Sequence, residues 1–112
     1  MKLYIAVLDE FPDYMTPTLV AHSMLGAHLH FTNANLIDVN SYSDYVEWLY
    51  NSFKKCVVRV NEREFNKICE LDAVYLGHEN STLDGRPSCA VVCPRKEIPN
   101  VLKFAKLWSP IK

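Results

Sequence analysis

The chain has 112 residues, of which 49% are hydrophobic and 22% charged, and its formal net charge is -1. This length suits one domain with one hydrophobic core, and the composition excludes a disordered chain. The near-neutral charge excludes a uniformly basic nucleic-acid binder but leaves room for a local basic patch. No run reaches the about 20 apolar residues of a membrane span, so we expect a soluble cytoplasmic protein without membrane contact.

The first elements are a strand and a helix joined by a polar loop. Lys2–Leu8 is the first predicted strand, and within it Tyr4–Leu8 is a continuous apolar run, which is typical of a central strand covered on both faces. The loop Asp9–Tyr14 follows, and then a helix over Thr16–Phe31, with Thr16 as the N-cap and Pro17 at the first helical position. The residues expected on its apolar face are Leu19, Ser23, Ala27 and Phe31.

The rest of the chain alternates helical and strand-like segments. The expected elements are a helix from Ser41 or Ser43 to about Phe53, a strand over Cys56–Val60, a helix over Glu62–Glu70, strands over Ala73–Gly77 and Cys89–Cys93, and a helix from Pro99 to Trp108. Asn61 and Glu64 form a near capping box before the third helix. Helical crossovers predict parallel neighbours among the first three strands.

These elements predict an α/β fold. The order β-α-α-β-α-β-β-α favours a three-layer sandwich, in which helices cover both faces of a mixed four-stranded sheet. We expect a single domain over residues 1–112. An exposed edge of such a sheet would also suit a homodimer.

Two polar loops and one histidine are the candidate functional residues. Ligands favour the carboxyl ends of strands in open α/β sheets, where Asp9 and Asp13 follow the first strand. These carboxylates would bind a cation, position a water or repel a wrong partner; the alternative is an ordinary solvated loop. His22 suits a general base or a tRNA contact, or is a half-buried helix histidine beside small residues.

The second polar loop lies between the last two predicted strands. It combines acids, bases and a hydroxyl group, which either form a site or satisfy turn amides. Its candidate residues are His78, Glu79, Thr82, Asp84 and Arg86.

The four cysteines lie at positions 56, 69, 89 and 93 without a Cys-x-x-Cys pair. We interpret them as small buried hydrophobic residues in a reducing compartment. A zinc site with His78 is the alternative, but its usual ligand spacing is absent. We therefore expect neither a metal nor a cofactor.

Basic residues form two groups along the sequence. One comprises Lys54, Lys55, Arg59, Arg63 and Lys67, and the other comprises Arg95, Lys96, Lys103, Lys106 and Lys112. They either form solvated faces or contact tRNA phosphate groups.

Three segments resemble the archaeal–eukaryotic type of peptidyl-tRNA hydrolase. The strand segment Leu3–Val7 resembles the opening strand of that family, and Ala21–Ala27 resembles its first-helix signature of a histidine followed by small residues. Tyr75-Leu76 with Thr82, Gly85 and Cys89–Pro94 resembles its closing hairpin. The resemblance implies this order of elements and an enzyme that cleaves the ester between a peptide and tRNA.

The chain departs from the family at its catalytic positions. Tyr14 and Met15 stand where the family has Gly-Lys, Leu19 stands at its Gln, and His78–Asn80 replaces its Asp-Ala-Gly. The lost lysine removes a cation that would hold phosphate or stabilise an oxyanion, and the lost aspartate removes the orienter of water. The residues that the resemblance carries over are His22, Glu79 and Thr82.

Two functions follow from this comparison. The first is a non-catalytic protein of this scaffold that binds or modulates tRNA or a tRNA-associated protein, for example as a phage-type modifier of a tRNA synthetase. The second is an active peptidyl-tRNA hydrolase with a rewired site. There, His22 or Glu79 would activate water and Thr82 would hold the carbonyl region.

Overall fold

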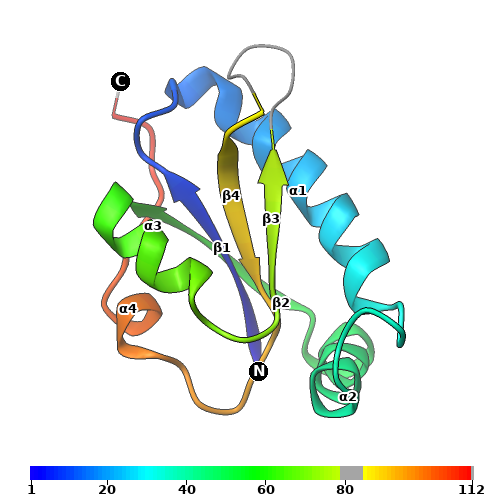
Figure 1. Ribbon diagram of the computed structural model, residues 1–112. Helices are drawn as coiled ribbons and strands as arrows, with labels where there is room; N and C mark the ends of the chain where they lie inside the picture. Colours follow the sequence, from blue (N-terminus) through cyan, green and yellow to red (C-terminus); the bar gives the residue numbers. More distant parts are fainter. Residues whose placement is uncertain (79–84, 112) are drawn as a thin grey trace.

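A computed structural model describes residues 1–78 and 85–111, and a five-stranded sheet forms its centre. The strands are β1 (Lys2–Leu8), β2 (Lys54–Val60), β3 (Val74–His78), β4 (Pro87–Val92) and β5 (Lys106–Leu107). Their order in the sheet is β3-β4-β1-β2-β5, so the first strand is central (Figure 1). Six of the seven β1 residues are buried, as the continuous apolar run predicts.

The sheet is mixed. β1 and β2 are parallel, whereas β4 is antiparallel to both β1 and β3, and β5 is antiparallel to β2. The predicted parallel neighbours are therefore right for β1 and β2 and wrong for β3, which lies beyond β4. Because β4 separates them, β3 runs parallel to β1 without pairing with it.

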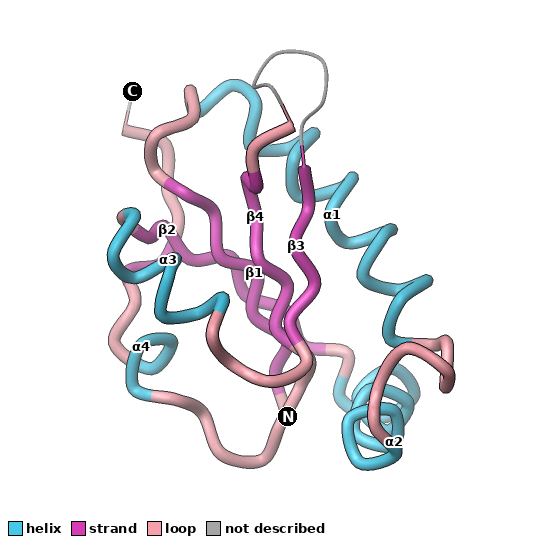
Figure 2. The backbone as a smooth tube through the Cα atoms, viewed as in Figure 1, coloured by secondary structure: helices cyan, strands magenta, loops and turns pink. Residues whose placement is uncertain are grey.

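Helices lie on both sides of this sheet. They are α1 (Thr16–Phe31), α2 (Val39–Glu47), α3 (Glu62–Cys69) and α4 (Asn100–Lys103), with a 3₁₀ turn η1 (Asp13–Met15) before α1 and a π-helical turn η2 (Trp48–Ser52) after α2. Figures 1 and 2 show α1 along one side and α3 with α4 on the other. The second helix, α2, begins at Val39 and so starts earlier than the expected Ser41 or Ser43.

Small residues allow α1 to lie close to β3. The buried residues of α1 include Leu19, Ser23, Ala27 and Phe31, as its spacing predicts. A Cβ atom added at Gly77 would overlap the Ser23 hydroxyl group and lie 2.7 Å from its Cβ. The small residues beside His22 therefore fit a close contact between helix and strand.

The predicted capping box begins α3. The Asn61 side chain accepts a hydrogen bond from the Glu64 amide at 2.8 Å, and the Glu64 carboxylate accepts one from the Asn61 amide at 2.9 Å. These two bonds satisfy amides that the first helical turn leaves free. Phe65 and Ile68 are buried, as expected.

The prediction of a long final helix and of only four strands is wrong. The helix α4 covers Asn100–Lys103 alone, and Phe104, which follows it, is 78% exposed. The chain then extends, and Lys106–Leu107 pairs with Val58 and Arg59 of β2. Hydrogen bonds to the otherwise free edge of β2 thus override the helical pattern of this segment. None of the helices in the described residues is long and apolar enough to cross a membrane.

Candidate functional site

The predicted acidic loop lies at the carboxyl ends of β1 and β2. The Asp9 amide donates a hydrogen bond to the Val60 carbonyl at 2.9 Å, which ties the loop to the end of β2. The side chain of Asp9 is exposed, and Asp13 begins the 3₁₀ turn η1. The structure therefore separates two roles within this loop: Asp9 faces solvent, whereas Asp13 makes contacts within the chain.

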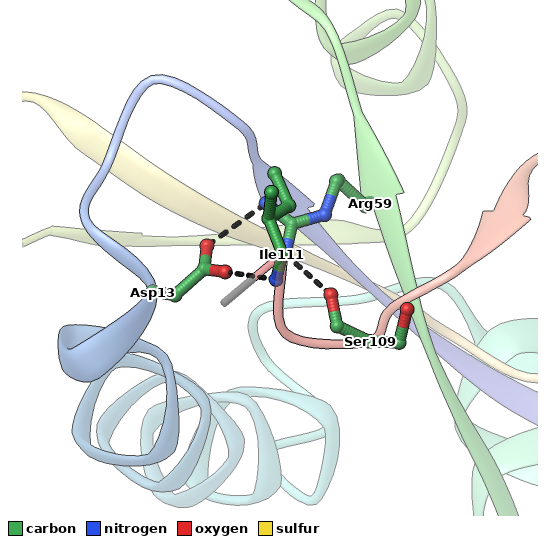
Figure 3. A network of polar contacts seen from close by, with 4 residues as sticks. All are labelled: Asp13, Arg59, Ser109 and Ile111. Carbon is green, nitrogen blue, oxygen red and sulfur yellow. Dashed lines mark hydrogen bonds and ion pairs between the residues drawn. The ribbon is translucent and has the colours of Figure 1, made fainter.

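Asp13 connects three segments of the chain (Figure 3). One carboxylate oxygen accepts a hydrogen bond from Arg59 at 3.0 Å, and the other accepts one from the Ile111 amide at 2.7 Å. Arg59 also donates to the Ser109 carbonyl at 2.7 Å. The Arg59 guanidinium, followed by the Ile111 amide, holds the pKa of Asp13 below its usual value. Asp13 therefore fastens the segment after β5 across this end of the sheet.

A second pair of contacts flanks the segment 79–84. Arg86 and Glu10 form an ion pair with atoms 2.6 Å apart, and both side chains are well exposed. Nδ1 of His78 donates to the Gly85 carbonyl at 2.6 Å. The structure thus brings Arg86, from the second polar loop, to Glu10 of the acidic loop.

Of the three predicted catalytic residues, His22 alone lies in the described part of the chain. His22 lies on the exposed side of α1 rather than half-buried. Glu79, Thr82 and Asp84 lie outside the described residues. Leu19, at the position of the family's glutamine, is 2% exposed and belongs to the core.

A basic cleft lies at the opposite end of the sheet, where sequence reasoning placed no site. Its volume is about 460 Å³, and it is lined by Met1, Lys2, Lys54, Arg95, Lys96 and Ile98. Lys2 and Lys54 are register partners at the beginnings of β1 and β2. The segment after β4 reaches the same end of the sheet as the N-terminus (Figures 1 and 2).

The cleft combines residues from both basic groups of the sequence. Arg95 is held by hydrogen bonds from its guanidinium to the carbonyl groups of Cys93 and Asp72, at 3.1 and 2.5 Å. No acidic side chain lines this cleft within the described residues. The parallel register of β1 and β2 is the signal that would have brought Lys2 and Lys54 together.

The cysteines provide no metal centre in the described part of the chain, where no three His, Cys, Asp or Glu side chains group closely enough to hold an ion. Cys89 and Cys93 are buried, and burial raises the pKa of both thiols, that of Cys93 to about 12. A buried neutral thiol is a poor metal ligand and a poor nucleophile. Cys89 and Cys93 are therefore core residues, as predicted, whereas Cys56 and Cys69 are only partly buried and pack against the core.

No family model matches the sequence, and no curated protein matches it.

Proposed function

We propose that this chain is a non-catalytic, peptidyl-tRNA-hydrolase-like protein that binds tRNA through the basic cleft. The cleft is the observation that carries the proposal. Lysines from β1 and β2 and basic residues from the segment after β4 line one concave surface, and none of its described lining residues is acidic. An acidic side chain, Glu47, lines an adjoining hollow that shares Met1 and Lys96 with the cleft. Phosphate groups of a nucleic acid are the ligands that such a surface favours.

The catalytic positions support binding without cleavage. Tyr14, where the resembled family has glycine of its Gly-Lys pair, is 82% exposed, and Met15 supplies no cation at the lysine position. The buried Leu19 supplies no polar group at the glutamine position. Asp13, the carboxylate that directly precedes Tyr14 and Met15 in the sequence, already accepts two hydrogen bonds. An oxyanion or an attacking water would thus lack these groups of the family.

Retention of tRNA and release of peptide, measured in one reaction, test this proposal. Purified protein is mixed with N-blocked aminoacyl-tRNA that carries a labelled peptide. We expect tRNA to be retained on a filter without release of the label. The double variant Lys54→Glu/Lys96→Glu should weaken retention at least tenfold, whereas Lys67→Glu, an exposed charge reversal on α3 outside this cleft, should change it little.

Each other result contradicts the proposal in a different way. Retention that survives the double charge reversal would exclude the basic cleft as the tRNA site. Turnover that His22→Ala abolishes would favour the rewired hydrolase. If the protein neither retains tRNA nor releases peptide, tRNA is excluded as the ligand. The search then turns to a tRNA synthetase or another protein as the partner.

A further inference from the structure

An apolar groove lies between α1 and the π-helical turn η2. Its volume is about 490 Å³, and one wall comes from Ala21, Met24 and Leu25 of α1. The opposite wall includes Leu49 and Phe53, and the lining is mainly apolar. Leu25 is 66% exposed and Phe53 is 56% exposed, so both walls present large apolar side chains to solvent. Exposed patches of this kind typically mark contact surfaces.

The polar groups beneath this groove already have partners. Nδ1 of His28 and the Tyr45 hydroxyl group are hydrogen-bonded at 2.9 Å, and the Trp48 indole donates to the Lys54 carbonyl at 2.7 Å. A ligand in the groove therefore meets apolar surface rather than unsatisfied polar atoms. Apolar side chains of a partner are the groups that such a lining favours.

The wall at Phe53 has an unusual backbone. Its φ angle is 58°, in the left-handed region, where a bulky side chain is rarely found. Phe53 caps the carboxyl end of the π-helical turn, and its amide donates to the Trp48 carbonyl at 2.7 Å. The Phe53 ring stacks on Trp48 with centroids 5.4 Å apart. Strained backbone and π-helical turns concentrate at functional sites, and here both position an exposed aromatic ring.

One cation stands at the rim of the groove. The Lys55 ammonium lies 3.2 Å from the centre of the Phe53 ring and donates to the Phe53 carbonyl at 2.6 Å. No carboxylate lines the groove within the described residues. A partner with an acidic group beside its apolar side chains would complement this charge.

The exposed leucines of α1 indicate the shape of that partner. Leu25 and Leu29 are both 66% exposed and are four residues apart, so they follow one side of the helix. An apolar ridge of this kind packs against the apolar stripe of a second helix. We propose that the groove binds an amphipathic helix of a partner protein, whose apolar stripe lies between Leu25 and Phe53 and whose carboxylate pairs with Lys55.

This inference does not depend on binding of tRNA. Lys54 lines the basic cleft and Lys55 lines the groove. Successive side chains of a strand point to opposite faces, so the two surfaces occupy different sides of β2. Substitutions in one surface should therefore leave the other intact.

Labelled synthetic helices provide the test. The probe is a 14-residue peptide, about four turns long, with leucines spaced to form one stripe and glutamates beside them; a second peptide replaces the glutamates with lysines. We expect fluorescence polarisation to show saturable binding of the acidic peptide and at least tenfold weaker binding of the basic peptide. Leu25→Gln should reduce binding about tenfold.

A second variant separates binding from folding. Phe53→Gly removes the aromatic wall of the groove, but glycine suits the left-handed backbone at this position. The variant should therefore preserve the melting temperature and weaken binding of the acidic peptide about tenfold. The control is Leu36→Gln, which changes a leucine of similar exposure outside the groove and should change neither property.

Three results would overturn the inference. They are equal affinity for the acidic and basic peptides, absence of binding at millimolar peptide, and binding that survives both Leu25→Gln and Phe53→Gly. Self-association that Leu25→Gln abolishes would instead assign the groove to a second copy of the chain. Retention of tRNA, measured on the same Leu25→Gln protein, should be unchanged and thus reports separately on the proposed function.

Discussion

Asp13 and Arg59 lie 46 residues apart in the sequence, yet their side chains form an ion pair with atoms 3.0 Å apart. The ion pair joins the turn after β1 to the carboxyl end of β2. Through the Ile111 amide and the Ser109 carbonyl, the same two side chains also hold the segment that follows β5. One carboxylate thereby fixes the end of the sheet where sequence reasoning expects a ligand.

Asp13→Asn should make the stability of the protein less dependent on acid pH. Because the folded-state pKa of Asp13 lies below its ordinary value of 3.8, ionisation of Asp13 stabilises the fold above pH 3.8, and this contribution is lost as pH falls through the lowered pKa. The free-energy difference between wild type and variant should be constant near neutral pH and shrink below about pH 4.

Urea unfolding at a series of pH values measures this difference. Asp9→Asn is the matched control, because its side chain is exposed at the other end of the same loop. A difference between wild type and Asp13→Asn that is the same at pH 3 and pH 7 would contradict the prediction.

Substitution of two glycines should have unequal effects on stability. Gly77→Ala places a methyl group against the Ser23 side chain and within 3.2 Å of its Cα, and the backbone of α1 cannot move away easily. We expect a loss of about 3 kcal/mol in the free energy of unfolding. Thermal or urea unfolding gives this value directly.

Gly26→Ala should cost less, about 1 kcal/mol, for two reasons. The new methyl group would meet the ring end of Tyr75, lying 2.6 Å from Cζ, and a side-chain end can rotate aside. Alanine also favours the helical conformation over glycine by about 1 kcal/mol, which offsets part of the overlap. Equal losses in the free energy of unfolding for both variants would contradict this prediction. They would show that the backbone of the sheet, rather than a side chain such as Tyr75, moves away from α1.

The four thiols should differ in their reaction with a thiol reagent. Cys56 and Cys69 are partly exposed, whereas Cys89 and Cys93 are buried. Because burial raises the pKa of Cys93 from 9.0 to about 12, its thiolate fraction at pH 8 is about a thousandfold lower than that of an ordinary cysteine. We expect two thiols to react in the native protein and four after unfolding.

The same buried thiol limits stability in alkali. The raised pKa of Cys93 favours the neutral thiol in the folded state. The resulting contribution to the free energy of unfolding is complete below pH 9.0 and is lost as pH rises towards about 12. Cys93→Ala should remove the share of Cys93 in this alkaline loss, which unfolding between pH 8 and pH 11 would detect. Rapid modification of all four thiols in the native protein would contradict both expectations.

Binding of tRNA should weaken with salt to a degree set by the number of lysines in the cleft. If Lys2, Lys54 and Lys96 each neutralise one phosphate, the logarithm of the association constant should fall with the logarithm of salt concentration with a slope of about -3. Each Lys→Gln change in the cleft should reduce this slope by about one. Filter retention between 50 and 200 mM salt, about the range over which such slopes are resolved, measures it, and an unchanged slope for Lys54→Gln would exclude that contact.

The parts of the fold that the sequence predicts are those with strong local signals. The apolar run of β1, the spacing of Leu19 and Phe31 in α1 and the capping pair Asn61 and Glu64 each specify their element through neighbouring residues. The segment after Pro99 carries a helical pattern that its tertiary partner overrides. Pairing with Val58 and Arg59 of β2 draws it into a strand, and no local signal reports that free edge.

The candidate sites divide in the same way. The loop of Asp13 could be placed at the carboxyl end of β1 because strand direction follows from chain order. Its partner Arg59 could not, because many basic residues were equally available in the sequence. The cleft of Lys54 and Lys96 was missed because its residues belong to two different basic groups, and only the sheet register unites them.

The central place of β1 also determines when the chain can complete its fold during synthesis. Tyr4 pairs with Cys56 on one side and with Val92 on the other. Both strands that pair with β1 are therefore synthesised long after β1 itself. Until β4 leaves the ribosome, one edge of this highly apolar strand has no native partner. Pairings between such distant segments slow folding, and an unpaired apolar strand is prone to aggregation. A nascent chain that stops before β4 should therefore depend on chaperones.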